Sequence, residues 1–441
     1  MTNKNQLVAA IDIGTTKIVA LVGQINENNR LEILGMSKTV SRGVKRGVVL
    51  NIEETVGAIE TTVREAQAQS GIVFRDVFVG IAGQHIKSVR NRGYINRDSY
   101  EDEITREDVK KLIEDMYRIP VENGEEIIHV LPQSFTVDSE TGVKNPVGMS
   151  GKRLEANFHI VIGQISSAKN IEKCINRAEM KVKQLILEPL ASSEAVLTDD
   201  EKEAGVAMVD IGGGTTDIAV YYDDIIRHTA VIPFGGNVIT RDIKEGCSIL
   251  QRQAESLKIQ FGSALGDLAL EDKIVTIPGI SGREPKEISF KSLAFIIQSR
   301  MEEILDAVLF EIENSGYLDK LSAGIVITGG GAMLKNLPQL VKFKTGLDVR
   351  IGFPNERLAA EKTEEVNQPM YATSIGLLLK GAEFLREHND VIPCEPALEE
   401  VKTEKPKVKK KDENRKIAKN SLITHWKQQI SNIFEENDTS M

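Results

Sequence analysis

The sequence predicts an α/β fold that consists of two related halves, with a small α+β insertion in the first half. The main evidence is a motif that occurs twice: an apolar strand, an aspartate, a glycine-containing turn with two threonines, and a second apolar strand. One copy spans residues 7–23 and the other spans residues 205–222. Asp12 and Asp210 occupy the same place in the two copies, which indicates an internal duplication. Composition agrees, because 5% aromatic and 27% charged residues are typical of a globular α/β protein.

The composition of the 441 residues also narrows the class of protein. A formal net charge of −10 argues against a general nucleic-acid-binding protein. The three cysteines, Cys174, Cys247 and Cys394, lack metal-ligand and redox spacing, so we expect a reducing cytoplasmic compartment. Residues 1–10 lack the basic and apolar regions of a signal peptide. No apolar run reaches the roughly 18 residues that a membrane-spanning helix requires.

One segment of the first half differs from its surroundings in its pattern of apolar and polar residues. Residues 85–97 alternate like a strand, and residues 154–162 alternate between apolar and polar as a half-buried strand does. Between them, Thr105 and Asp108 have the spacing of a helix capping box. We therefore expect residues 85–162 to form an inserted α+β subdomain.

The remaining elements complete the two halves. Helices are predicted over residues 55–69 and 167–180 in the first half. In the second half, residues 242–260 carry apolar side chains at i, i+4 and i+7 spacing, which predicts one amphipathic helix. A helix over 301–312 and a strand over 324–328 follow. The predicted parts are residues 1–84 with 163–195 as the first half, 85–162 as its insertion, 196–236 with 300–389 as the second half, and 237–299 as a smaller subdomain.

The two glycine turns have the features of a phosphate-binding site. Their backbone N–H groups and small hydroxyls can contact phosphate oxygens, because glycine permits a close approach of the backbone. Asp12 and Asp210, at the ends of apolar strands, can hold Mg²⁺ through water. Lys17 could add a positive charge or point outward from its strand, and the alternative for both turns is a pair of tight hairpins without a ligand. The phosphate-binding candidates are Gly14, Thr15 and Thr16 in the first turn and Gly212, Gly213, Gly214, Thr215 and Thr216 in the second.

Three further features could belong to the same site. A glycine turn at residues 329–332 lies between a predicted strand and a predicted helix, where glycine would let a flat base lie against the backbone; a close strand-to-helix turn is the alternative. Glu255 and Lys258, three residues apart on a predicted helix, could reach a ribose or base, or form an exposed salt bridge. Another glycine turn follows a predicted strand at residues 235–237. The candidates are Gly235, Gly236, Asn237, Glu255, Lys258, Gly329, Gly330, Gly331 and Ala332.

Five segments occur in an order that resembles the nucleotide-site motifs of the actin, Hsp70 and sugar-kinase superfamily. They are Asp12–Thr16, Glu188–Ser192, Asp210–Asp217, Gly329–Ala332 and Tyr371–Gly376. The resemblance implies two actin-like, ribonuclease-H-like halves around a nucleotide cleft. In that superfamily the hairpins bind phosphates, the later glycine turn binds adenosine, and the second and fifth motifs form crossing helices, here including residues 371–385. It also implies that Glu188 orients the attacking water; the alternative is a helix-start carboxylate beside Pro189 with no catalytic role.

The last part of the chain has a different character. Residues 390–420 contain few apolar side chains and alternate lysine with glutamate, which predicts a disordered basic linker. Residues 421–435 predict an amphipathic helix whose apolar stripe has no core of its own to cover. A membrane, a partner's groove or the body of the protein could cover it, and the linker lysines favour anionic lipid at about 1 kcal/mol each. The membrane-facing candidates are Leu422, Ile423, Trp426, Ile430, Ile433 and Phe434, with Lys427 beside the stripe.

Together, the insertion, the nucleotide motifs and the tail resemble the FtsA family of bacterial cell-division actin homologues. That resemblance implies an ATP- and Mg²⁺-binding assembly protein rather than an enzyme, with at most a slow ATPase activity. It also implies actin-like self-association and attachment of the tubulin-like protein FtsZ to the cytoplasmic side of the cell membrane at the division septum. Arg300 and Glu303 match the FtsZ-binding helix of the family, with two solvated helix charges as the alternative. Residues 85–162 would bind later division proteins, and several tails on one polymer would strengthen a membrane contact that one tail makes weakly.

Other members of the superfamily fit less well. A sugar kinase requires a catalytic aspartate at an acceptor hydroxyl, and we find no candidate for one. An Hsp70-like chaperone requires a large β-rich domain after the ATPase, but mostly linker follows Gly381. A rod-shape homologue would lack the insertion, and a pilus-type homologue would lack the lysine-rich linker and the terminal helix.

Overall fold

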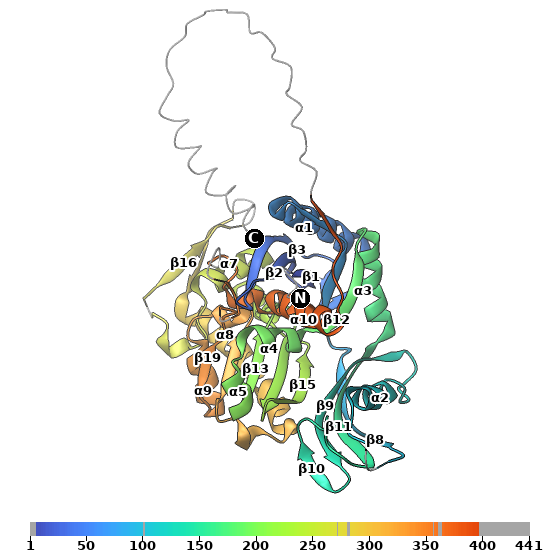
Figure 1. Ribbon diagram of the computed structural model, residues 1–441. Helices are drawn as coiled ribbons and strands as arrows, with labels where there is room; N and C mark the ends of the chain where they lie inside the picture. Colours follow the sequence, from blue (N-terminus) through green and yellow to red (C-terminus); the bar gives the residue numbers. More distant parts are fainter. Residues whose placement is uncertain are drawn as a thin grey trace, which may run out of the picture. The chain divides into compact units, whose positions relative to one another are not determined.

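The computed structural model describes residues 6–99, 102–270, 272–279, 283–355, 357–359 and 364–396 (Figure 1). The described residues up to Glu395 form one compact unit. The predicted amphipathic helix over residues 421–435 and most of the predicted linker lie outside the described residues. Within the described part, no helix has the length and apolar character needed to cross a bilayer.

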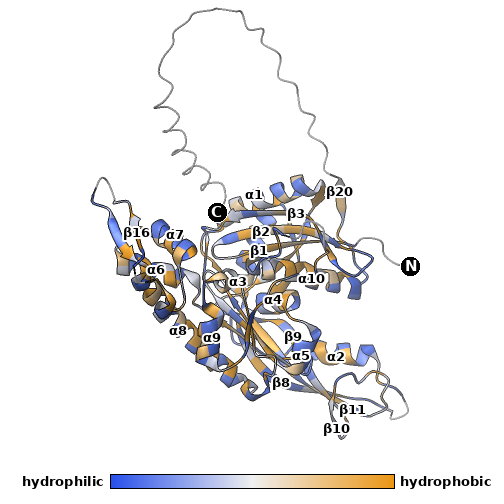
Figure 2. Ribbon diagram, turned by 90° about the vertical axis from the view of Figure 1, so that its left-hand side faces the viewer, coloured by the Kyte–Doolittle hydropathy of each residue, from blue (hydrophilic) through white to orange (hydrophobic). Residues whose placement is uncertain are grey.

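The first half is built on a five-stranded mixed sheet with the order β12-β7-β1-β2-β3. Its strands are β1 (Gln6–Ile13), β2 (Lys17–Ile25), β3 (Leu31–Val40), β7 (Asp76–Ile81) and β12 (Lys181–Leu187). β1 pairs antiparallel with β2 and parallel with β7. Helix α1 (Ile52–Ser70) packs against β2 and β3, while α10 (Ala372–Glu387) covers the opposite face (Figure 2). Because helices cover both faces, β1 and β2 are nearly continuous apolar runs.

The second half repeats this sheet strand for strand. Its order is β15-β14-β13-β18-β19, and β13 pairs antiparallel with β14 and parallel with β18, as β1 does with β2 and β7. The strands are β13 (Val206–Ile211), β14 (Thr216–Tyr222), β15 (Ile225–Ile232), β18 (Ile325–Thr328) and β19 (Val349–Ile351). Asp12 and Asp210 lie one residue before the ends of the equivalent strands β1 and β13. The duplication predicted from the repeated motif is therefore confirmed.

Two helices pack against each other between the sheets (Figure 1). α4 (Glu188–Val196) contacts β13 and β14, and α10 contacts β1 and β2. The two backbones come very close at Gly376, where an added Cβ would overlap the carbonyl oxygen of Ala191. These are the crossing helices that the Glu188 and Tyr371 motifs predicted.

The insertion is a four-stranded antiparallel sheet with the order β10-β9-β11-β8, and helix α2 packs against it. Its elements are β8 (Lys87–Asn96), α2 (Arg106–Met116), β9 (Glu125–Val137), β10 (Glu140–Val143) and β11 (Arg153–Gln164). Thr105 and Asp108 form the predicted capping box. The insertion has its own apolar core, which includes the fully buried Phe158. The α+β character predicted for residues 85–162 is confirmed.

The insertion also contacts the second half of the protein. Gln133 donates hydrogen bonds to the carbonyl oxygens of Ile226 and Arg227, at 2.8 and 3.1 Å. Ser88 donates to the carbonyl oxygen of Thr229 at 3.0 Å. The inserted sheet is therefore joined covalently to the first half and packs on β15, the edge strand of the second.

The smaller subdomain contains α6 (Gly236–Cys247), α7 (Gln251–Phe261), β16 (Ile274–Ile277), β17 (Lys286–Ser289) and the start of α8 (Phe290–Ser315). The single helix predicted over residues 242–260 is wrong. Ser248 adopts a left-handed conformation with φ 51° and ends α6. Leu250 then starts a new helix, and its N–H donates to Gln253. Helix α8 is also longer than the predicted 301–312.

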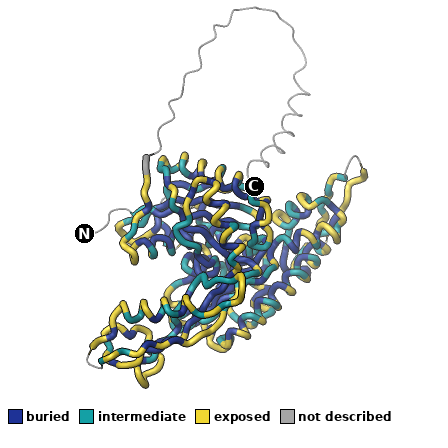
Figure 3. The backbone as a smooth tube through the Cα atoms, turned by 90° about the vertical axis from the view of Figure 1, so that its right-hand side faces the viewer, coloured by how far each residue is buried: buried dark blue, intermediate teal, exposed yellow. Residues whose placement is uncertain are grey.

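The remaining elements are the helices α3 and α9 and a set of shorter segments that connect the larger elements. They are β4 (Val44–Lys45), β5 (Val48–Val49), β6 (Ile72–Phe74), α3 (Ile165–Arg177), α5 (Asp199–Ala204), α9 (Leu337–Thr345), β20 (Cys394–Pro396) and the 3-10 helices at Gly266–Leu268, Leu318–Lys320, Gly330–Met333 and Pro369–Tyr371. Figure 3 shows that the buried residues concentrate in the sheets and on the inner faces of the helices.

Candidate functional site

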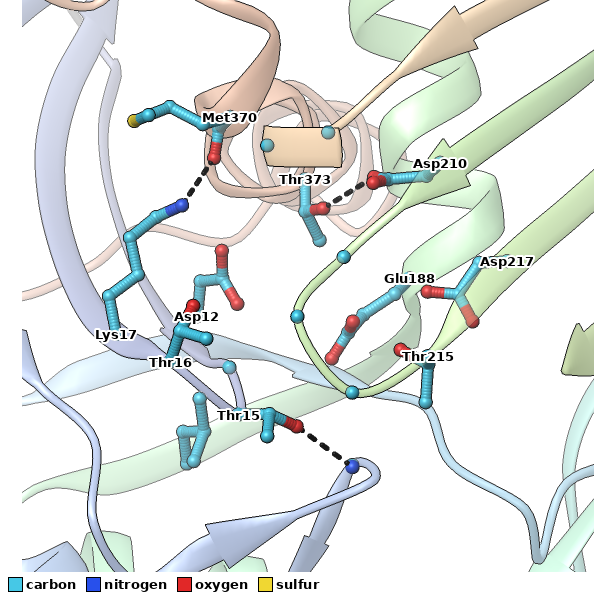
Figure 4. A pocket seen from close by; sticks show the side chains of 18 residues that line it. Asp12, Thr15, Thr16, Lys17, Glu188, Asp210, Thr215, Asp217, Met370 and Thr373 are labelled. Atoms are coloured by element: carbon cyan, nitrogen blue, oxygen red, sulfur yellow. Dashed lines mark hydrogen bonds between the residues drawn. The ribbon is translucent and has the colours of Figure 1, made fainter. Parts of the chain in front are cut away.

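The two glycine turns face each other across one cavity, with residues from both halves around it (Figure 4). The first turn joins β1 to β2, and the second joins β13 to β14. The lining residues are Asp12, Ile13, Gly14, Thr15, Thr16, Lys17, Gly47, Glu188, Asp210, Gly212, Gly213, Gly214, Thr215, Asp217, Gly329, Gly330, Met370 and Thr373. The duplicated motif therefore produces one shared site rather than two separate hairpins.

Close contact between the turns explains two of their glycines. A Cβ added at Gly213 would overlap the Thr16 side chain, and one added at Gly214 would overlap Thr15. Any larger residue would push the turns apart. Glycine is therefore required here by the packing of one half on the other, in addition to the backbone access that a phosphate needs.

Both aspartates are buried and held by hydroxyls of the crossing helices. Asp12 is 7% exposed and Asp210 is 5% exposed. Ser374 donates to Asp12 Oδ2 at 2.7 Å, and Thr373 donates to Asp210 Oδ2 at 3.0 Å. Ser192 donates to the same Asp210 oxygen at 2.7 Å. Burial raises the pKa of both carboxyls, and these hydrogen bonds oppose the rise.

Two more carboxyl groups line the same cavity. Glu188 is the first residue of α4, and Asp217 lies on β14. Burial raises the pKa of each well above its usual range, and the neighbouring aspartates add to the rise. Asp217 Oδ1 is buried without a hydrogen-bond partner among the described residues. The cavity thus brings together four carboxyl groups, whose charged forms a bound cation would stabilise.

Lys17 points toward the site rather than outward from its strand. Its Nζ donates to the carbonyl oxygen of Met370 at 2.7 Å and lies 5.3 Å from the centre of the Tyr371 ring. Burial lowers the pKa of its ammonium group, and Asp12 and Asp210 oppose that effect. Lys17 is the one basic residue among those that line the cavity.

The other predicted candidates lie beside the cavity rather than in its lining. The N–H groups of Gly236 and Asn237 donate to the carbonyl oxygens of Gly212 and Gly213, so the 235–237 turn supports the second glycine turn. Lys258 forms an ion pair with Glu255 at 2.8 Å and donates to the carbonyl oxygen of Gly236 at 3.1 Å. The salt bridge is therefore present, but it is partly buried rather than exposed, and it supports the same turn. Gly235, Gly331, Ala332 and Thr216 also adjoin the lining without belonging to it.

Some residues of the site were missed by the sequence interpretation. Gly47 lines the cavity, and its N–H donates to Thr15 Oγ1 at 3.2 Å, but no pattern around it signals this role. Ser192, Thr373 and Ser374 fall inside motifs that were recognised, yet their hydroxyls were assigned no function. Asp217 likewise ends a recognised motif.

The donor set suits a hydrated divalent cation and a polyphosphate. Carboxylates and hydroxyls are ligands that Mg²⁺ accepts, usually with several waters retained. Within the described residues, no group of three or more His, Cys, Asp or Glu side chains is arranged to bind a metal directly.

Arg300 and Glu303 lie on α8 in the smaller subdomain. Arg300 pairs with Asp242 on α6 and with Glu303 at 2.5 Å. The side chain of Glu303 is 64% exposed and that of Arg300 is 27% exposed. The structure thus brings these two residues together on a surface, and neither of them lines the cavity between the glycine turns.

The repeated sheet, the crossing helices and the shared cavity define an actin-like fold. Solved structures agree: the PilM–PilN type IV pilus biogenesis complex gives a TM-score of 0.61 at 15% identity, covering 85% of this chain and 98% of that chain. The structure of MreB5 of Spiroplasma citri bound to ADP gives a TM-score of 0.52 at 14% identity, covering 87% of this chain and 98% of that chain.

Sequence comparisons identify the family within this class. Residues 207–376 match the family described as cell division protein FtsA, and residues 83–162 match the SHS2 domain inserted in FtsA. The cell division protein FtsA of Pseudomonas aeruginosa is 40% identical over 379 residues, 86% of this chain and 90% of that protein. FtsA of Escherichia coli K12 is 37% identical over 385 residues, 86% of this chain and 91% of that protein. The chain belongs to the FtsA family of cell division proteins.

Proposed function

We propose that the cleft binds ATP with Mg²⁺ and that this binding supports assembly of a cell-division protein on a membrane. The observation that carries the proposal is the meeting of Asp12 and Asp210, from equivalent strands of two related halves, at one cavity lined by glycine turns. Fold neighbours support it, since MreB5 of Spiroplasma citri is described in complex with ADP and with AMPPNP.

Each part of the site has a role in this proposal. The N–H and hydroxyl groups of the two turns bind the phosphates, and Lys17 supplies a positive charge. Asp12 and Asp210 hold the hydrated Mg²⁺, which when bound neutralises phosphate charge. The Gly329–Ala332 turn lies against adenosine.

Glu188 takes the place of the residue that orients an attacking water. Burial and the neighbouring aspartates raise the pKa of Glu188, which favours its protonated form, whereas a bound cation would favour the carboxylate that can accept a proton. The protein is then an assembly protein, with at most a slow ATPase activity.

The proposal extends to the location and partners of the protein. The amphipathic helix that the sequence predicts over residues 421–435 attaches the protein to anionic lipids on the cytoplasmic side of the cell membrane, at the division septum. The body polymerises as actin-like proteins do, and the polymer anchors the FtsZ ring through a surface that includes Arg300 and Glu303. Residues 85–162 recruit later division proteins. Support comes from the family, from the exposure of Glu303 and from the amphipathic pattern of the tail.

Calorimetric titration of the full chain with ATP tests the nucleotide proposal. We expect saturable binding in Mg²⁺ and much weaker binding in excess EDTA, because the carboxylates repel an uncompensated triphosphate. Co-sedimentation of the chain with anionic vesicles and purified FtsZ then tests the assembly. Absence of ATP binding in Mg²⁺ would refute the nucleotide site, and FtsZ left in the supernatant would refute the anchoring role.

A further inference from the structure

One short segment contacts residues from both sides of the cleft. Residues 369–374 lead into α10 and belong to neither glycine turn, and Figure 4 shows the contacts of Met370 with Lys17 and of Thr373 with Asp210. The carbonyl oxygen of Pro369 accepts from Gly329 N–H at 3.2 Å, that of Met370 accepts from Lys17 at 2.7 Å, Thr373 donates to Asp210 at 3.0 Å, and Ser374 donates to Asp12 at 2.7 Å.

The last two contacts come from neighbouring residues of one helix and reach carboxylates of two different sheets. Asp12 belongs to the first half and Asp210 to the second. The positions of Thr373 and Ser374 on α10 therefore set where the two carboxylates lie relative to each other. Hydrogen bonds to buried charged groups are strong enough to hold such a position.

We propose that Ser374 and Thr373 are positioning residues, which orient the carboxylates of Asp12 and Asp210 to receive the hydrated Mg²⁺ of the nucleotide. This inference rests on the proposed nucleotide-binding function and specifies how the site is held. The proposal predicts that the affinity for ATP in the presence of Mg²⁺ depends on these two hydroxyls, because they orient the two aspartates.

The two hydroxyls differ in how much each contributes to holding its aspartate. Asp210 accepts from Ser192 as well as from Thr373, and those hydroxyls lie 3.0 Å from each other. Asp12 accepts one side-chain hydrogen bond among the described residues, from Ser374. Removal of the Ser374 hydroxyl therefore leaves the Asp12 carboxylate without this hydrogen bond. Removal of the Thr373 hydroxyl leaves Asp210 still hydrogen-bonded to Ser192.

The first test compares two serine-to-alanine variants. Ser374→Ala removes the hydroxyl that holds Asp12. Ser193→Ala is a matched control, because Ser193 is also buried in a crossing helix but donates to the backbone oxygen of Pro189 at 2.7 Å. ATP affinity is measured by calorimetry in excess Mg²⁺ and in EDTA. We expect Ser374→Ala to lose about tenfold or more in Mg²⁺, the factor expected for a hydrogen bond to a charged group, with little change in EDTA. Ser193→Ala should match the parent in both.

A second pair of variants tests Thr373, which donates to Asp210, and separates the effect of its side-chain shape from that of its hydrogen bond. In a Ser192→Ala background, Thr373→Val keeps the shape of the side chain but removes its hydroxyl, and Thr373→Ser keeps the hydroxyl. We expect the valine variant to weaken Mg²⁺-dependent binding and the serine variant to retain it. This pair also decides the question if thermal melting shows that Ser374→Ala does not fold.

The outcomes distinguish this inference from the proposed function. If the parent chain fails to bind ATP in Mg²⁺, the nucleotide site itself is refuted. If the parent binds in a Mg²⁺-dependent manner while Ser374→Ala equals Ser193→Ala, or Thr373→Val equals Thr373→Ser, the positioning role alone is overturned.

Discussion

The crossing of α4 and α10 offers a sharp test of how the two halves are held together. A Cβ built at Gly376 would lie 1.8 Å from the carbonyl oxygen of Ala191, and this atom cannot move without moving α4. The helices must therefore separate by more than an ångström to accept alanine. Overpacking of this kind costs about 1–3 kcal/mol and occasionally more, and a clash between two backbones belongs at the upper end. We expect Gly376→Ala to lower the free energy of unfolding by about 3 kcal/mol or more.

Gly57 provides the matched control. It lies inside α1, is exposed, and has nothing within 4 Å of an added Cβ. Alanine there should raise the free energy of unfolding by about 0.5–1 kcal/mol, because glycine is a poor residue inside a helix. Urea unfolding followed by circular dichroism compares the two variants with the parent. If Gly376→Ala unfolds at the same urea concentration as Gly57→Ala, the close crossing does not limit stability and the reasoning fails.

Four further perturbations test the site, the tail, the predicted FtsZ surface and the insertion. Asp210→Ala should weaken Mg²⁺-ATP binding by about tenfold or more in calorimetry, since it removes a carboxylate that faces the cation; unchanged affinity would count against the site. Removal of the residues after Asn420 should abolish sedimentation with anionic vesicles while ATP binding persists, and unchanged sedimentation would reject the tether. Arg300→Glu should place three carboxylates together and reduce co-sedimentation with FtsZ, with ATP affinity as the control; full recruitment would remove Arg300 from the interface. Burial lowers the pKa of His129 to about 4, so its neutral form is favoured in the folded state and its contribution to folding becomes unfavourable as pH falls below about 6.5. Between pH 7.5 and 5 the folded protein should lose about 2 kcal/mol through this group, and His129→Gln should unfold in urea with a smaller pH dependence; an equal dependence in the variant would contradict the assignment.

The duplicated fold could be predicted because its signal is local and repeated. The strand, aspartate and glycine turn occur twice within short segments, and nearest-neighbour pairing of β1 with β2 and of β13 with β14 follows directly from them. The capping box at Thr105 is equally local, since it involves residues three positions apart. In each case the sequence pattern and the structural contact span the same few residues.

The errors and omissions arise where the signal is not local. The break between α6 and α7 occurs at Ser248 without proline or glycine at that position, so apolar periodicity continued across it. Gly47 reaches the cavity only because the chain between β4 and β5 folds back on Thr15. Its role depends on tertiary contact, and nothing in the flanking sequence distinguishes it from the glycine of any tight turn.

The duplication by itself does not make a binding site. Two copies of a strand with a terminal aspartate specify two strand ends, and they leave the distance and orientation between those ends free. A third segment, which belongs to neither copy, supplies that relation: Thr373 and Ser374 are adjacent on α10 and hydrogen bond to Asp210 and Asp12. Gly376 then fixes α10 against α4, whose Ser192 also holds Asp210. The geometry of the cleft is therefore set by the crossing helices, and any change in how they pack must alter the proposed nucleotide site.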